Sequence, residues 1–366
     1  MKDIRQHFPV LAYSTYLDTA ANGLVPEPVI AWRREQEDEL LNNPLEYRKN
    51  TPEILKSTRQ TIAEFLHASA EEVALIPNFS FGINSILEAL PTDQKIAMLR
   101  DEYPSVSWPV LSRNFKTCLI DIKPDLEENI LRIVETEKPD VLLFSLVQWQ
   151  DGLKIDLAFL KSLKENHPKL LLIADGTQFL GTVAFDFNNS PIDIMITSAY
   201  KWLTAGFGSG FLLFKKEAQA RFNMRTIGFQ SADSFESPRE ATRFIKHFEP
   251  GHLASLNYGS IEQAIQFFNA NQPKARYEHI RHLAKEAKGE FIEMGLLPRY
   301  IAERKVHSSI FNLKGDAAVF KRLEQNNFAC SMRGDGIRVS FHYYNSQDDL
   351  NHLVDVLKNH RKSFVL

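Results

Sequence analysis

The sequence contains little cysteine and no long apolar run. Its 366 residues include only two cysteines, Cys118 and Cys330. This count excludes a disulfide scaffold and leaves too few thiols for a multi-cysteine zinc site, so we expect no metal centre. Reduced thiols are normal in the cytosol, which favours a cytoplasmic protein. No window approaches the roughly 18 uninterrupted apolar residues of a transmembrane helix, and the first residues do not have the pattern of a signal peptide. We therefore expect no membrane association.

The chain also has little net charge and no internal repeat. Lys and Arg number 43 and Asp and Glu number 46, which gives a net charge of −3. This balance does not suggest a nucleic-acid or acidic-lipid partner. The length exceeds the size at which a single core usually keeps growing. We therefore expect a large domain and a smaller one.

Short apolar segments alternate with amphipathic ones through the first half of the chain. The segments predicted as strands are 71–76, 95–99, 117–120, 141–147, 170–174, 192–196 and 211–214. The segments predicted as helices are 28–41, 53–66 with Pro52 at its first turn, 83–90, 105–114, 126–135 and 157–166. Uninterrupted apolar strands that alternate with amphipathic helices predict an α/β fold, with a mainly parallel sheet covered on both faces.

The second half of the chain follows a different pattern. Residues 215–250 show no clear periodicity and predict a long irregular loop, which is usually functional inside a compact enzyme. The pattern beyond it predicts helices at 253–271, 273–294, 317–326 and 347–360 and strands at 306–313 and 336–341. This order predicts a small α+β domain. We place the large domain at 16–255 and the small one at 1–15 and 256–366.

A single lysine, Lys201, stands between two apolar segments in the stretch 192–214. Burying an ammonium group is costly unless it is paired or loses its proton. Such a lysine either extends its amine to water from a strand end or serves as a nucleophile toward a carbonyl, with a lowered pKa. The local pattern leaves both possibilities open.

Polar side chains follow several predicted strands directly. Asp175 follows the strand 170–174, and Gln148 and Trp149 follow the strand 141–147. The carboxyl ends of parallel strands share one edge of a sheet, where ligands of such folds bind. Asp175 alone could be a turn cap. Together with Lys201 it matches the needs of pyridoxal 5′-phosphate, whose aldehyde forms a Schiff base with a lysine and whose ring nitrogen is kept protonated by a carboxylate.

The same cofactor needs a phosphate site, an aromatic face and a partner for its ring oxygen. Phe79 and Ser80 precede a predicted helix, whose free N–H groups and dipole favour an anion. Ser198 adds a hydroxyl near the lysine, and Tyr103 is a candidate stacking ring. Gln178, three residues after the aspartate, is the candidate partner of the ring oxygen, with Gln148 as a second amide. Each of these residues is weak evidence for the cofactor by itself. Together they are stronger evidence, because one cofactor requires all of them.

With these residues, the chain resembles the class V aminotransferase family of fold-type I pyridoxal-phosphate enzymes. This group includes cysteine desulfurases, kynureninases and isopenicillin-epimerase-like proteins. The segments that carry the resemblance are YLDTAANGLVP (16–26), NFSFGIN (78–84), EYPS (102–105), ADGTQFLG (174–181), SAYKW (198–202) and GIRVSFHYYNSQDDL (336–350). The resemblance implies a large domain with a mainly parallel seven-stranded sheet, a smaller C-terminal α+β domain and a homodimer with shared active sites.

The resemblance also implies roles for individual residues. Lys201 would form the Schiff base, and Arg338 would hold the substrate carboxylate, since a planar fork suits a carboxylate. The cofactor would be bound by Asp175, Gln178, Tyr103, Phe79, Ser80, Ser198 and Tyr200. His252 takes the place of the usual threonine that reaches the phosphate of the neighbouring subunit, so this contact departs from the family pattern.

Several reactions remain open, all starting from an amino acid. The sequence favours an aminotransferase. A cysteine desulfurase or selenocysteine lyase is the alternative, but the segment before Arg338 is too short for the family's cysteine loop, and Cys330 has the pattern of a small buried apolar residue. Cys118 lies within an apolar strand and is expected to be structural. A kynureninase-like lyase and a non-catalytic protein of the same fold are further alternatives.

The substrate pocket is less well defined by the sequence. Arg333 lies close to Arg338 and is a candidate for holding a second carboxylate of the substrate. Other residues expected near the side-chain pocket are Asn22, Tyr47, Arg48, Trp149 and His252. The glycines at 206, 208 and 210 are expected to let the backbone pass close to the cofactor and to the facing subunit.

Overall fold

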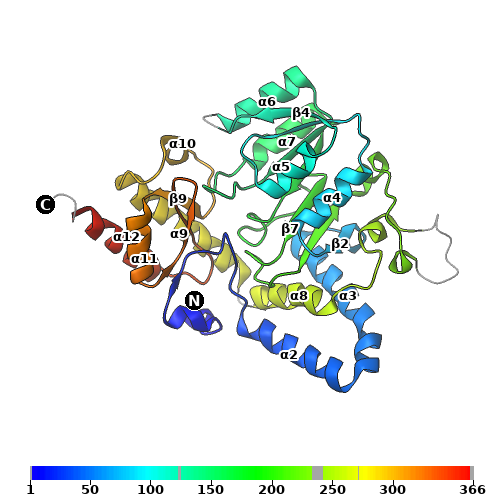
Figure 1. Ribbon diagram of the computed structural model, residues 1–366, viewed down its shortest axis with the longest axis horizontal. Helices are drawn as coiled ribbons and strands as arrows, with labels where there is room; N and C mark the ends of the chain where they lie inside the picture. Colours follow the sequence, from blue (N-terminus) through cyan, green and yellow to red (C-terminus); the bar gives the residue numbers. More distant parts are fainter. Residues whose placement is uncertain (1, 123–124, 233–241, 271, 363–366) are drawn as a thin grey trace.

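The fold contains a large seven-stranded β-sheet, a small three-stranded one and a two-stranded pair. The computed structural model describes residues 2–122, 125–232, 242–270 and 272–362. Figure 1 shows the large sheet, seen through its helices, in the cyan and green part of the chain. The small sheet lies with the C-terminal helices on the opposite side of the molecule, close to the N-terminal segment. The described part contains no helix that is both long and apolar enough to cross a membrane.

The large sheet has seven strands in the order β2-β8-β7-β6-β5-β3-β4. Their bounds are β2 Val73–Ile76, β3 Lys95–Leu99, β4 Lys116–Ile120, β5 Val141–Ser145, β6 Leu171–Asp175, β7 Ile194–Ser198 and β8 Gly210–Phe214. Only β8 runs antiparallel to its neighbours, β2 and β7, and the other pairs are parallel. The expected mainly parallel sheet of seven strands is therefore confirmed.

Helices cover both faces of this sheet, and this explains why its strands are apolar throughout. In β6, Leu172 and Ala174 belong to the core on one face, whereas Leu171 and Ile173 belong to the core on the other. The first face packs against α3 (Pro44–Leu66), α6 (Leu126–Glu137), α7 (Leu157–Asn166) and α8 (Ser255–Ala270). The second face packs against α4 (Phe79–Ala89) and α5 (Pro104–Leu111). Each fully buried aliphatic side chain stabilises the fold by about 1.5–3 kcal/mol.

Several helix boundaries differ from the prediction. The helix expected at 83–90 begins at Phe79, so Phe79 and Ser80 lie in its first turn, and the helix expected at 105–114 ends at Leu111. We expected Pro52 to begin a helix, but α3 begins at Pro44 and runs through Pro52 without a break. Proline costs a helix one backbone hydrogen bond. The neighbouring Thr51 hydroxyl donates to the carbonyl of Tyr47 at 3.0 Å, which is not the carbonyl that Pro52 leaves without its helical donor. The first turn of α3 instead uses Pro44 where no N–H partner is needed.

The small sheet is antiparallel and has the order β11-β12-β9. Its strands are β9 (Ile310–Lys314), β11 (Ser331–Arg333) and β12 (Gly336–Ser340). The helices of the C-terminal part are α9 (Pro273–Glu293), α10 (Arg299–Ala302), α11 (Ala317–Gln325) and α12 (Gln347–Lys362). The expected small α+β unit is therefore present.

The N-terminal segment joins the two parts of the molecule. It comprises α1 (Lys2–Arg5), a 3-10 turn at Pro9–Ala12 and β1 (Thr15–Tyr16), followed by α2 (Glu27–Asn42). β1 pairs in parallel with β10 (Phe328–Ala329), whereas α2 packs against α3 and α8. The domain boundaries at 15/16 and 255/256 stay a prediction.

The segment 215–250 contains no long regular element among its described residues. It forms 3-10 turns at Lys216–Arg221, Phe229–Ser231 and Phe244–Phe248. Ser234, Ser237 and Pro238, which contributed to the loop prediction, lie outside the described residues. The turn at Phe244–Phe248 packs Ile245 and Phe248 into the core of the second sheet face.

Candidate active site

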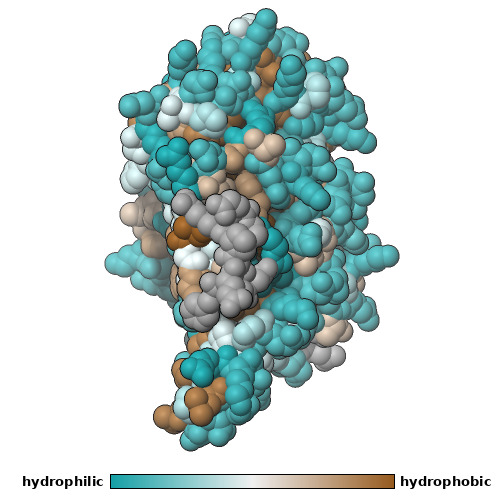
Figure 2. Space-filling model, turned by 90° about the vertical axis from the view of Figure 1, so that its right-hand side faces the viewer, coloured by the Kyte–Doolittle hydropathy of each residue, from teal (hydrophilic) through white to brown (hydrophobic). Residues whose placement is uncertain are grey.

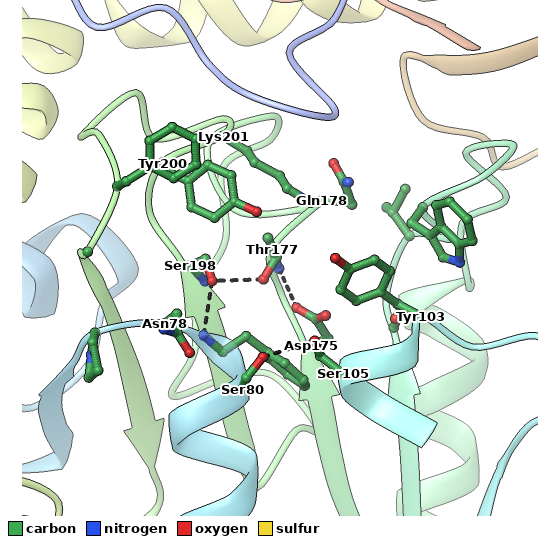
Figure 3. A pocket seen from close by; sticks show the side chains of 17 residues that line it. Asn78, Ser80, Tyr103, Ser105, Asp175, Thr177, Gln178, Ser198, Tyr200 and Lys201 are labelled. Atoms are coloured by element: carbon green, nitrogen blue, oxygen red, sulfur yellow. Dashed lines mark hydrogen bonds between the residues drawn. The ribbon is translucent and has the colours of Figure 1, made fainter. Parts of the chain in front are cut away.

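A cavity of about 260 Å³ opens at the carboxyl ends of β5, β6 and β7 (Figure 3). This is the edge at which the sequence placed the candidate site. The predicted residues that line the cavity are Lys201, Asp175, Gln178, Tyr103, Phe79, Ser80, Ser198 and Tyr200. Arg338 and His252 do not line it. The structure therefore brings together predicted residues from four separate segments, at a sheet edge that the parallel topology creates.

Lys201 lies in the turn after β7 and is 7% exposed. Its Nζ atom is 5.6 Å from the ring centroids of both Tyr103 and Tyr200. Burial lowers the pKa of Lys201 to about 8, and the charge of Asp175 opposes this change. The positive charges of Arg338 and Arg333 lower the pKa further. A lysine that loses its proton so readily carries a substantial fraction of nucleophilic amine near neutral pH.

Gly23, on the N-terminal segment, passes directly against the backbone of this lysine. A Cβ atom on Gly23 would stand 1.8 Å from the carbonyl oxygen of Lys201. The Gly23 N–H also donates to the carbonyl of Tyr200 at 2.9 Å. Glycine is therefore required here for close approach.

Asp175 ends β6 and points into the cavity (Figure 3). Its Oδ1 accepts a hydrogen bond from the backbone N–H of Thr177 at 2.8 Å. Burial raises the pKa of Asp175, whereas the Thr177 hydrogen bonds and the charge of Lys201 act to lower it. A bound cationic group would therefore be strongly stabilised beside this carboxylate.

A second buried carboxylate, Glu102, lies beside the cavity and was missed by our sequence reasoning. It accepts hydrogen bonds from the Ser145 N–H and hydroxyl, both at 2.6 Å, and from Gln148 Nε2 at 3.0 Å. Burial raises the pKa of Glu102, and the charge of Asp175 adds to this effect. The available signal was a glutamate directly before Tyr103, three residues beyond the apolar strand that ends at Leu99. Gln148 is thereby held in place by Glu102.

The N-terminus of α4 faces the cavity and provides the candidate phosphate site. Asn78 caps the helix by accepting from the Phe81 N–H at 2.9 Å. The Phe79 N–H donates to Ser198 Oγ at 2.9 Å, and Ser80 Oγ donates to Ser105 Oγ at the same distance. Hydroxyls and first-turn N–H groups at the positive end of a helix form an anion site.

Two further predicted residues are held firmly at the cavity. Gln178 donates from Nε2 to the carbonyl of Ala20 at 2.9 Å and accepts at Oε1 from Trp202 Nε1 at 2.7 Å. Because an amide nitrogen carries two protons, one remains for a ligand. The Tyr103 ring lies edge-on to Trp149, with centroids 5.6 Å apart.

Arg338 lies on β12, next to the cavity wall. Its guanidinium donates to the Trp149 carbonyl at 2.8 Å and to Asp18 Oδ1 at 3.5 Å. It is 3% exposed, and its buried Nε has no hydrogen-bond partner among the described residues. Ser331 is the direct register partner of Arg338, so Arg333 is its diagonal neighbour on the same face of the sheet. Both arginines can therefore act on one ligand.

Other candidates lie outside the cavity. His252 stacks on Phe229 with ring centroids 5.9 Å apart. Of the residues expected at the side-chain pocket, Trp149 lines the cavity, whereas Asn22, Tyr47 and Arg48 do not. Gly208 lines it and has a φ of 76°, and Gly206 has a φ of 84°, so both positions favour glycine. Among the described residues, no group of three His, Cys, Asp or Glu side chains is placed to hold a metal ion.

The two cysteines are poor candidates for nucleophiles. Burial raises the pKa of Cys330 to about 12, with the charges of Asp18 and Glu324 adding to the effect. Burial also raises the pKa of Cys118, which lies in β4. Since the thiolate is the reactive form, neither group is activated.

The groups around the cavity match the needs of pyridoxal phosphate in kind. They comprise a desolvated amine, a buried carboxylate, a helix N-terminus with hydroxyls and an aromatic ring. A buried arginine with an unpartnered Nε stands beside them. The fold and this set of groups together define a pyridoxal-phosphate enzyme of the α/β type.

Comparison with known proteins agrees with this conclusion. The model of the family described as aminotransferase class-V matches residues 15–353, so the chain belongs to the class V aminotransferase family. The uncharacterized aminotransferase YcbU of Bacillus subtilis (strain 168) is 21% identical over 358 residues, covering 96% of this chain and 95% of that protein. A probable cysteine desulfurase of Ureaplasma parvum serovar 3 (strain ATCC 700970) is 22% identical and covers 99% of this chain and 98% of its own length.

A solved structure confirms the fold. The cystine C-S lyase C-DES, in complex with its reaction product cysteine persulfide, superimposes with a TM-score of 0.84 at 20% identity, covering 95% of this chain and 98% of that one. Class V aminotransferases use pyridoxal phosphate, so the protein is a pyridoxal-phosphate-dependent enzyme, and the expected family, fold class and cofactor are confirmed.

Proposed function

We propose that this protein is an aminotransferase in which Lys201 forms the Schiff base with the cofactor. The observation that carries the proposal is the desolvated amine of Lys201, with a pKa of about 8, in one cavity with the buried carboxylate of Asp175. When bound, the cofactor supplies an aldehyde for the lysine and a ring that accepts electrons from the substrate. The remaining chemistry belongs to the side chains of the protein.

Each side chain has a defined task in this proposal. Asp175 would hold a proton on the ring nitrogen, and Gln178 would donate its free N–H to the ring oxygen. Phe79, Ser80, Ser198 and Tyr200 would hold the phosphate at the start of α4, and Tyr103 would cover the ring. Lys201, with a pKa of about 8, would also be able to move a proton to and from the substrate Cα.

The substrate is proposed to be an amino acid whose α-carboxylate binds Arg338. Three of the five guanidinium N–H groups of Arg338 are not used by Trp149 or Asp18 in the described structure. Arg333, the diagonal neighbour on the same sheet face, would hold a second carboxylate of a dicarboxylic substrate. In that case Arg333→Gln raises KM for glutamate or aspartate about tenfold but leaves KM for alanine unchanged. An equal rise for all three substrates would refute the role of Arg333.

We also propose a homodimer with shared active sites, in which His252 serves the neighbouring subunit. Within one chain His252 lies outside the cavity, as a residue acting on the partner would. Exposed apolar side chains flank the site, including Phe207 at 66% and Trp108 at 67%. Figure 2 shows further hydrophobic side chains on the protruding corner between α2 and α3, where Leu41 is 78% exposed. Burial against a second copy would remove this surface from water.

Light scattering after size exclusion tests the dimer. Mixing inactive Lys201→Ala and His252→Ala subunits tests the sharing of sites. If His252 acts in trans, a mixed dimer that forms by subunit exchange regains one complete site. A monomeric mass, or activity that does not recover on mixing, would refute this arrangement.

The two free cysteines support a cytoplasmic location in this proposal.

A C–S lyase is the second candidate, because curated relatives include probable cysteine desulfurases. A desulfurase needs a cysteine that takes up sulfur. With a pKa of about 12 and no position in the cavity lining, Cys330 does not suit that role. The observation therefore favours transamination, or an elimination that needs no cysteine, over desulfuration.

An amino-acid panel tests the reaction class. The holoenzyme is mixed with single amino acids, and its visible absorbance is followed. A transaminase loses its band once per site and regains it with a keto acid, whereas a lyase releases pyruvate, alanine or sulfide over many turnovers. Catalytic product release without a keto-acid acceptor would overturn the aminotransferase assignment. The non-catalytic alternative fails if either response depends on Lys201.

A further inference from the structure

A second cavity lies away from the catalytic one and shares none of its lining residues. Its volume is about 570 Å³, which is in the range of small-molecule sites. One wall is a single face of α9, from Lys274 to Lys288. The other wall consists of Lys154, the segment 182–184 and the segment 305–309. The cavity thus forms where α9 meets loops that follow β5 and β6 and lead into β9.

This cavity carries a strong positive charge on a chain that is slightly acidic overall. Its cationic lining residues are Lys154, Lys274, Arg281, Lys285, Lys288 and Lys305. Glu278 is the only carboxylate among the lining residues. Apart from Lys288, which donates to a backbone carbonyl, none of these cations forms a hydrogen bond or ion pair with another described residue. Six cations gathered in one hollow with a single lining carboxylate repel one another, so the hollow favours an anion.

The spacing along α9 concentrates these charges on one side. Residues 274, 281, 285 and 288 are seven, four and three positions apart, so they lie on one helical face. Like charges at such spacings destabilise a helix by about 0.2–0.5 kcal/mol per pair. Arg281, Lys285 and Lys288 form two such pairs, whereas Glu278 lies four residues after Lys274 and three before Arg281 and offsets the charge at the start of the helix. The uncompensated positive charge of α9 therefore lies at residues 281–288.

The cavity lining contains one buried hydroxyl without a partner and one partly buried amine. Ser309 is 4% exposed, and its buried hydroxyl has no hydrogen-bond partner among the described residues. The Lys154 amine lies 5.1 Å from the centroid of Phe179, and burial lowers its pKa. A buried donor without a partner costs about 1–3 kcal/mol, and a ligand oxygen would satisfy both groups.

Apolar side chains complete the wall. Val183, Ile280, Ala284 and the ring of Tyr277 line the same cavity as the cations. A hollow of this size with cations, one buried hydroxyl and an apolar wall fits a compact ligand that is anionic at one end and apolar at the other. We propose that this cavity, which we call the α9 cleft, binds a small phosphate ester that carries two or more phosphate groups and an apolar moiety.

Calorimetry with the holoenzyme tests the proposal, because bound cofactor keeps the catalytic phosphate site occupied. The probes are sodium tripolyphosphate, ADP and inorganic phosphate. We expect ADP and tripolyphosphate to bind, ADP more tightly because of its apolar part, and inorganic phosphate to bind least. The affinities for ADP and for tripolyphosphate should fall as the salt concentration rises from about 50 to 300 mM, since salt screens the attraction between the cations of the cleft and the ligand.

The test variant is Lys285→Gln with Lys305→Gln. Both side chains are exposed, so the fold is expected to persist. The matched control is Lys116→Gln with Lys161→Gln, which removes the same charge from exposed positions outside the cleft. The cleft variant should weaken tripolyphosphate and ADP binding about tenfold or more, whereas the control changes it less than twofold. Ser309→Ala should weaken both as well, with the holoenzyme absorbance unchanged.

Three outcomes would overturn the proposal. The first is ADP and tripolyphosphate binding that is absent at millimolar concentration, or equal in the cleft and control variants. The second is binding of phosphatidylserine vesicles, lost in the cleft variant, without binding of ADP, which would make the ligand a membrane surface. The third is binding of a poly-glutamate peptide alone, which would make it an acidic protein. None of these outcomes bears on the catalytic assignment, since no cleft residue lines the catalytic cavity.

Discussion

The low pKa of Lys201 predicts how the apoenzyme captures its cofactor as pH changes. With a pKa of about 8, roughly one lysine in eleven carries a free amine at pH 7. An ordinary lysine, with a pKa near 10.5, is free in roughly one molecule in three thousand at that pH. Desolvation in the cavity therefore raises the reactive fraction by about 300-fold.

The sign of the pH effect follows from the same shift. The capture rate should rise about tenfold per pH unit up to a pH near 8 and then level off, because nearly all of the amine is free above that pH. Stopped-flow absorbance, after mixing apoenzyme with pyridoxal phosphate, measures this rate. The reaction of pyridoxal phosphate with Nα-acetyl-lysine, whose side-chain amine has an ordinary pKa, is measured over the same pH range. This control allows the effect of the cofactor's own titration to be subtracted.

Two variants separate the causes of the shift. Arg338→Gln removes a cation that lowers the pKa of Lys201, so the break in the profile should move to higher pH. Asp175→Asn removes an anion that raises it, so the break should move to lower pH. The reasoning is refuted if the wild-type rate keeps rising to pH 10, or if both variants move the break in the same direction.

Three other perturbations test the site. Asp175→Asn should lower kcat about 100-fold or more while the visible band still forms on Lys201, and unchanged turnover would contradict the role of this carboxylate. Gly23→Ala should reduce the free energy of unfolding by about 1–3 kcal/mol and weaken cofactor binding, since its Cβ would stand 1.8 Å from the Lys201 carbonyl oxygen. Its control is Gly289→Ala, on α9 with open space around it, which should leave the free energy of unfolding unchanged or raise it. Glu102→Gln places an amide donor against the Ser145 and Gln148 donors and should lower the free energy of unfolding, measured by thermal unfolding, by about 1–3 kcal/mol. The control is Glu88→Gln, which changes the exposed ion-pair partner of Arg113 and should cost less than about 1 kcal/mol. Equal costs would refute a specific role for Glu102.

Much of the architecture was predictable because its signals are local. The apolar strands alternate with amphipathic helices, so the parallel sheet, and with it the edge that holds Asp175 and Lys201, followed from periodicity. The start of α3 was not predictable in this way. Pro52 is a usual helix start, and only the packing of the whole helix against α2 and α8 keeps it in an interior position.

The sequence by itself determined the chemistry of the first step: one lysine and one aspartate at neighbouring strand ends, and the motifs around them, indicate a single cofactor. Tertiary structure decided the features that join distant segments. The burial of Glu102 against Ser145, the passage of Gly23 over Lys201 and the placing of Arg333 beside Arg338 all depend on contacts between separate elements. The same holds for the α9 cleft, whose positive charge arises only when one face of α9 meets Lys154 and Lys305. Charge and burial depend on three-dimensional neighbours, and for that reason the pKa of Lys201 could be assigned only from the folded chain.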